Sequence, residues 1–118
     1  MAGYNWDAGK SNNTVFAETN GLLPKSKITT AWLAEAGVKE SATFIKWLIA
    51  KHCIAHDEWH HTSKRFNRTN FYSRESIAAK LAELDTLGLL APYRTAYTTP
   101  ELRDADPYTL RSWAIKNR

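Results

Sequence analysis

Apolar residues recur at intervals of three and four along three stretches of the chain, a pattern typical of amphipathic helices. The first stretch is ITTAWLAEAG, which follows Ser26 as the predicted N-cap and ends at Gly37. The second, ATFIKWLIAKH, follows Ser41. The third, RESIAAKLAELDTLG, follows Ser73 and ends at Gly88. Two of the predicted helices are therefore joined by a glycine turn.

A change of pattern follows the second of these helices. DEWHHTS has no helical stripe, NFYS favours a β-strand, and the polar, basic segment KRFNRT lies between them. These features predict a small antiparallel hairpin with an exposed basic loop. The fold class expected is mainly α with this hairpin, that is, α+β.

The two ends of the chain carry weaker signals. A short helix is predicted over 11–18, and residues 1–10 are expected to form an arm. Pro92 interrupts the apolar segment LLAPYRTAY, which favours an edge strand or an extended packing segment. Thr-Pro at 99–100 and Asp-Pro at 106–107 each resemble an N-cap followed by proline, so two short terminal helices are expected.

Composition indicates one folded domain. The chain has 118 residues, of which 43% are hydrophobic, and a formal net charge of +4, so a polyanionic partner is weakly favoured. Cys53 is the only cysteine, which excludes an internal disulfide and a cysteine-rich zinc site. The sequence shows neither an apolar run of membrane-spanning length nor an N-terminal signal peptide, and a cytoplasmic location is expected.

The element order helix, turn, helix, strand, basic loop, strand over residues 11–90 resembles a winged helix, with 91–118 as a C-terminal extension. That resemblance implies that the helix after Ser41 faces DNA and that the hairpin is the wing. No Arg, Asn or Gln lies between Glu40 and Ala50, so phosphate contact or binding to a protein is favoured over base reading. The expected nucleic-acid or partner contacts are Lys39, Lys46, Lys51, Lys64, Arg65, Phe66, Arg68 and Tyr72.

The histidine pair allows a second interpretation. EWHHTS resembles the first strand of HNH-type ββα-metal nucleases, which implies that one of His60 and His61 binds a divalent metal ion and the other is a general base. The chain lacks a histidine after His61, and adjacent residues of a strand point to opposite faces. A structural pair, with one histidine packed inward, is the favoured alternative, and no cofactor is expected.

Two segments, SNNTVFAETNGLLPKSK and EWHHTSKRFNRTNFYS, are similar to segments of short, uncharacterised bacteriophage and plasmid proteins. The resemblance implies a mobile-element accessory protein, a class that includes inhibitors of CRISPR and restriction systems.

The leading hypothesis is a noncatalytic protein in the host cytoplasm that binds DNA, RNA, or a host protein or ribonucleoprotein complex that handles nucleic acid. An HNH-like nuclease and a winged-helix DNA-binding regulator are the alternatives.

Overall fold

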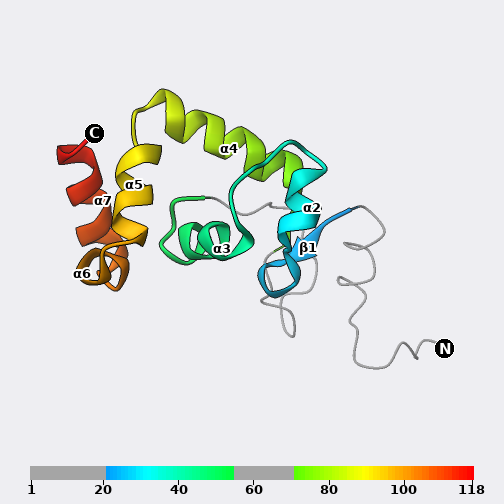
Figure 1. The fold of residues 1–118 in the computed structure, drawn as a ribbon, viewed down its shortest axis with the longest axis horizontal. Coiled ribbons are helices and arrows are strands. Elements are labelled where there is room, and N and C mark those ends of the chain that lie inside the picture. Colours follow the sequence, from blue (N-terminus) through cyan, green and yellow to red (C-terminus); the bar gives the residue numbers. More distant parts are fainter. Residues whose placement is uncertain (1–20, 55–70) are drawn as a thin grey trace, which may run out of the picture.

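The computed structural model describes residues 21–54 and 71–118 (Figure 1). This part of the chain is mainly helical and contains a two-stranded antiparallel sheet, which confirms the α+β prediction at that level. The elements in chain order are β1 (Leu23–Pro24), the 3-10 helix η1 (Lys25–Lys27), α2 (Thr30–Ala34), α3 (Ala42–Ala50), β2 (Phe71–Tyr72), α4 (Arg74–Thr86), α5 (Leu90–Tyr97), α6 (Pro100–Arg103) and α7 (Pro107–Lys116).

Side-chain caps start three of the long helices where the sequence predicts them. The hydroxyl of Ser41 accepts a hydrogen bond from the Phe44 amide, and that of Ser73 accepts one from the Ser76 amide. The carboxylate of Asp106 accepts one from the Thr109 amide. Each cap satisfies an amide that has no partner within its helix.

The start of α2 differs from the prediction. Ser26 lies inside η1, and Ile28 after it is extended. Thr29 is the residue that caps α2, because its hydroxyl accepts from the Trp32 amide at 3.1 Å. The helix therefore begins four residues after Ser26, and its predicted N-cap was wrong.

The sheet pairs the predicted strand NFYS with a segment that was not expected to be a strand. β1 and β2 are antiparallel, with Leu23 opposite Tyr72 and Pro24 opposite Phe71. The other predicted strand, the basic loop, the helix over 11–18 and the arm lie outside the described residues. The pairing joins the segment before α2 to the segment before α4.

The prediction of an extended segment around Pro92 was wrong, because Leu90–Tyr97 is the helix α5. Pro92 is the third residue of that helix. An amide in the first helical turn has no partner within the helix, so the missing N–H costs nothing there. Helices at Pro100–Arg103 and Pro107–Lys116 confirm the two predicted terminal helices.

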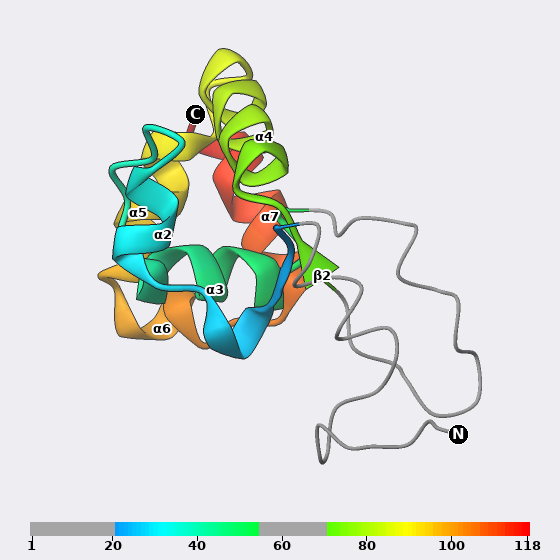
Figure 2. The ribbon, with the colours of Figure 1, turned by 90° about the vertical axis from the view of Figure 1, so that its right-hand side faces the viewer.

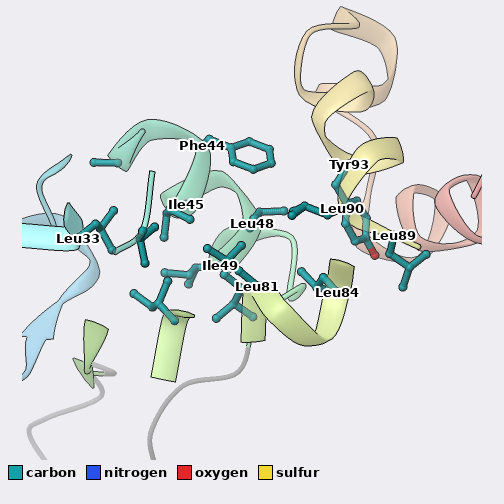
Figure 3. Packing of buried hydrophobic residues seen from close by; sticks show 14 of the residues in the cluster. Leu33, Phe44, Ile45, Leu48, Ile49, Leu81, Leu84, Leu89, Leu90 and Tyr93 are labelled. Carbon is teal, nitrogen blue, oxygen red and sulfur yellow. The ribbon is translucent and has the colours of Figure 1, made fainter. Parts of the chain in front are cut away.

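Helix α3 lies at the centre of the core. In Figure 1 it lies between α2 and the group formed by α5, α6 and α7, and α4 lies over it in both Figure 1 and Figure 2. Ile45 and Leu48 are 0% exposed. Figure 3 shows residues of α4 and α5 around them. The same buried cluster includes Leu110 and Ala114 of α7, so the C-terminal helices share one core with α2–α4.

Three helix ends have the same hydrogen-bond pattern. After α3, the Cys53 amide donates to the Leu48 carbonyl and the His52 amide donates to the Ile49 carbonyl, which is a Schellman motif. The left-handed residue of this motif is His52, at φ 62°. The corresponding residues after α2 and α4 are Gly37 and Gly88. A non-glycine residue in this conformation carries a steric cost from its Cβ atom.

We predict that His52→Gly raises the free energy of unfolding by about 0.5–1 kcal/mol, because the Cβ atom is removed from a left-handed position at a smaller cost in chain entropy. Gly37→Ala is the reverse change. No atom lies within 4 Å of a Cβ placed there, so the backbone angle alone should lower stability, by about 1 kcal/mol. Urea denaturation measures both. A change in the free energy of unfolding in the same direction for both variants would contradict this account of the helix ends.

Candidate nucleic-acid interface

The two glutamates of the α2–α3 region are each paired with an arginine from a later helix. Arg74, at the start of α4, has Nη1 3.0 Å from Oε1 of Glu35, and its guanidinium lies over the Trp32 ring at 5.6 Å. Arg94 of α5 donates from Nη2 to Oε2 of Glu40, and this hydrogen bond raises the pKa of Arg94. Both carboxylates of this region are therefore neutralised from outside it.

The lysines of the same region are not neutralised in this way. Residues 21–54 hold five lysines and two glutamates. Lys25, Lys27 and Lys39 are exposed and Lys46 is half-buried, and none of them forms an ion pair within residues 21–54 and 71–118. Since η1 packs against α3, Lys25 and Lys27 lie beside that helix. The region is electropositive.

One narrow stripe of α3 is open to solvent. Thr43 and Ala50 are exposed and Lys46, between them, is half-buried, and at 100° per residue the three lie on one side of the helix. Ala42 and Ile49 on one flank are buried. Trp47 borders the stripe on the other flank. The stripe presents one cation, one hydroxyl and one methyl group, and no amide or guanidinium group.

The flank of α3 next to this stripe is held by the C-terminal helices. The indole Nε1 of Trp47 donates to the carbonyl of Arg103 at 3.0 Å, and Nζ of Lys51 donates to the carbonyl of Ala105. The rings of Phe44, Trp47 and Tyr97 pack together, with Tyr97 5.3 Å and 5.4 Å from the other two ring centroids. Trp47 and Lys51 therefore fasten α3 to α6 and to the segment between α6 and α7.

The predicted contact residues thus fall into three groups. Lys39 and Lys46 lie on the electropositive region around α3. The Lys51 ammonium is bonded to a backbone carbonyl, and Tyr72 is 4% exposed within the core cluster, so both have structural roles in this fold. The remaining predicted contacts, Lys64, Arg65, Phe66 and Arg68, lie outside the described part of the chain. So do His60 and His61, the alternative metal ligand and general base.

Sequence reasoning did not find Lys25 and Lys27 as members of this region. They lie in a segment that it assigned to the approach to a helix, and their position beside α3 follows from the packing of η1. Two lysines flanking one serine in KSK were the only local signal. A pair of exposed lysines is too common on protein surfaces to indicate a site by itself.

Comparison with known proteins gives no relative. No protein-family model, no curated protein and no solved structure matches the chain. Within residues 21–54 and 71–118, no three His, Cys, Asp or Glu side chains are grouped so that they could hold a metal ion. None of the helices in that part combines the length and apolar character needed to cross a bilayer.

Cys53 lies where α3 meets the C-terminal helices. Burial raises the pKa of its thiol, although hydrogen bonding to Tyr93 of α5 opposes this change. Burial likewise raises the pKa of the Tyr93 phenol. A raised thiol pKa disfavours the nucleophilic thiolate. Cys53 therefore acts as a small packing residue at this junction.

Trp47→Phe tests the attachment of α3 to α6. The variant keeps an aromatic ring but loses the N–H donor to the Arg103 carbonyl, so we expect the free energy of unfolding to fall by about 1 kcal/mol. Trp32→Phe is the matched control, because the Trp32 indole N–H makes no hydrogen bond within the described residues. Urea denaturation measures the free energy of unfolding of both variants. An equal decrease in the two would contradict a specific role for the hydrogen bond of Trp47.

Proposed function

We propose that this chain is a noncatalytic nucleic-acid-binding protein that holds duplex DNA against the α2–turn–α3 region through phosphate contacts. The observation that carries the proposal is the separation of charge around α3. Arg74 and Arg94 neutralise both glutamates of the region, while Lys25, Lys27 and Lys39 remain exposed. Exposed lysines displace counterions from phosphates and bind DNA without reading its sequence.

The order and pairing of the elements support the same proposal. Helices α2 and α3 are joined by a glycine turn, and β1 and β2, which flank the pair in sequence, lie antiparallel to each other. A strand before a helix-turn-helix that pairs with a strand after it is an arrangement found in winged helices. We propose that α3 takes the place of the DNA-facing helix of such a fold.

The open stripe of α3 favours contact that does not depend on base sequence. Bidentate recognition of bases uses Arg, Lys, Asn or Gln side chains that project into the major groove. The stripe of Thr43, Lys46 and Ala50 offers a single lysine. Helix α6, attached through Trp47, borders the stripe on one side. This surface is therefore suited to bind the phosphate backbone of DNA through lysines beside the stripe.

The biological setting that we propose comes from the resemblance of SNNTVFAETNGLLPKSK and EWHHTSKRFNRTNFYS to phage and plasmid proteins. In that setting the chain is a mobile-element accessory protein that occupies DNA, and inhibition of a host defence system is one use of such binding. The basic segment KRFNRT has the composition to add contacts to the same duplex.

Binding of a fluorescent 20-base-pair duplex, measured by anisotropy at several salt concentrations, tests the proposal. Affinity should fall steeply between about 50 mM and about 200 mM salt. Lys39→Ala and Lys46→Ala should each weaken binding and reduce the slope of log K against log salt by about one unit, similarly for duplexes of different sequence. Lys80→Ala is the matched control, because Lys80 of α4 is paired with Glu83 at 3.0 Å.

Two results would contradict this function. One is the absence of binding at about 50 mM salt, where phosphate contacts are strong. The other is binding whose salt slope is unchanged in Lys39→Ala and Lys46→Ala. The first result would leave RNA or a host protein as the partner, and capture of that partner with the wild-type chain, lost with Lys39→Glu, would then identify it. The second result would place the DNA contact outside the α2–α3 region.

A further inference from the structure

A pocket of about 350 Å³ lies where α5 meets α6. The residues that line it are Tyr97, Thr98, Pro100, Arg103 and Asp104. The two helices pack against each other at the end of the described chain away from α2 (Figure 1). The volume is at the lower end of the range for small-ligand sites, which is about 300–1,000 Å³. The pocket therefore has room for one small, compact group.

The pocket presents a cation and an anion that are both available to a ligand. Arg103 and Asp104 are exposed. Within residues 21–54 and 71–118 neither of them forms an ion pair, not even with the other. A guanidinium only donates hydrogen bonds and an ionised carboxylate only accepts them. A phosphate alone would be repelled by Asp104, so the pocket suits a ligand that offers donors and acceptors together.

The side chain and the backbone of Arg103 are both held in place. The guanidinium lies over the Tyr97 ring, 4.6 Å from its centroid, and the Tyr97 ring packs against that of Trp47 at 5.4 Å. The Arg103 carbonyl accepts a hydrogen bond from the Trp47 indole at 3.0 Å, and the Arg103 amide donates to the Thr99 carbonyl at 2.8 Å. A wall fixed before binding lowers the entropy cost of taking up a ligand.

The stacked pair Arg103–Tyr97 also suits a flat ligand. Unpaired nucleobases stack on aromatic rings and on guanidinium planes, and this wall contains one of each. Pro100 adds an apolar surface to the lining. The pocket thus combines a stacking surface with one donor group and one acceptor group, which are the three components of base recognition.

We infer that this pocket binds an unpaired guanine base. The N1–H and 2-amino groups of guanine lie side by side and donate to the two oxygens of one carboxylate, that of Asp104. The O6 and N7 atoms on the adjoining edge accept from one guanidinium, as they do from arginine in duplex DNA. Adenine carries an amino donor where guanine has O6, so it does not complement Arg103. Base pairing occupies N1–H and the amino group, so the base comes from a free nucleotide or a single strand.

The pocket adjoins the proposed DNA surface but is separate from it. Trp47 borders the open stripe of α3 on one side and contacts Tyr97 of the pocket on the other. Lys39 and Lys46 line no part of the pocket. The inference goes beyond the proposed function and does not depend on it, because guanine binds here whether or not a duplex binds at α3.

Titration of the isotope-labelled whole chain with guanosine monophosphate (GMP) and inosine monophosphate (IMP), followed by NMR, tests the inference. The two nucleotides share the sugar and the phosphate and differ in the 2-amino group of guanine. GMP should shift the amides of residues 98–104 with a Kd of about 1 mM or below, a weak affinity that suits an exposed site. IMP should bind about tenfold more weakly, because it lacks one donor to the carboxylate.

Two variants test the assignment of the two edges of the base. Asp104→Asn should weaken GMP binding about tenfold and remove the preference for GMP over IMP. Arg103→Lys retains the charge but not the paired donors, and should remove the preference for GMP over 7-deaza-GMP, which lacks N7. Glu101→Gln is the matched control for lost charge, because Glu101 lies on α6 and lines no part of the pocket. Circular dichroism should be unchanged, because these side chains are exposed.

Further measurements identify the source of the base and separate this site from the proposed function. An oligothymidine strand with one central guanine should bind more tightly than the all-thymidine strand, and Asp104→Asn should remove the difference. Affinity above that of GMP assigns the pocket to a single strand, and affinity equal to it assigns the pocket to a free nucleotide. Lys39→Ala should weaken duplex binding but leave the ratio of GMP to IMP affinity unchanged.

Three outcomes would overturn the inference. The first is the absence of shift changes at residues 98–104 with about 5 mM GMP. The second is equal affinity for GMP and IMP, which would mean that the base is not recognised. The third is a preference for GMP that Asp104→Asn leaves unchanged.

Discussion

The burial of α3 on two sides is the constraint on which the rest of the structure depends. Ile45 and Leu48 are completely buried, and burying side chains of this size stabilises a fold by about 1.5–3 kcal/mol each. Helices α2 and α4 cover one part of the helix. Trp47 and Lys51 bind the C-terminal segment over another part. Within residues 21–54 and 71–118, the enclosed helix keeps the stripe of Thr43, Lys46 and Ala50 open for contact with a partner.

This enclosure also determines the electrostatics of the proposed interface. Glu35 and Glu40 belong to the α2–α3 region, but their partners Arg74 and Arg94 come from α4 and α5. The later helices therefore remove negative charge from a surface that they do not themselves form. Exposed ion pairs of this kind add little stability, so their main consequence is for the field that a polyanion meets.

Local patterns predicted the elements whose signals lie within a few residues. Ser41 and Ser73 were correct as caps, and the long helices that follow them were correct in position. Pro92 was misread because its position in the first turn depends on where α5 begins. The strand Leu23–Pro24 was missed because a two-residue strand is defined by its partner, which is distant in sequence. Such features follow from tertiary contacts that no local pattern contains.

The candidate site, like the fold, was predictable only where local patterns define it. Lys39 and Lys46 could be found from their places on and before a helix, whereas Lys51, next to the same helix, is bonded to a carbonyl 54 residues away. Lys25 and Lys27 join the site only through the packing of η1 on α3. The sequence identifies the lysines that could contact phosphate. Long-range packing determines which of them remain available for that contact.

The most direct test of the account is an NMR titration of the isotope-labelled chain with a short DNA duplex at low salt. The account predicts that amide shifts change at Lys25, Lys27 and Lys39 and at the stripe residues Thr43, Lys46 and Ala50. Amides of the buried α3 flank and of α7 should be little affected. Shift changes concentrated in α7, with none around α3, would contradict the proposal that this region faces nucleic acid.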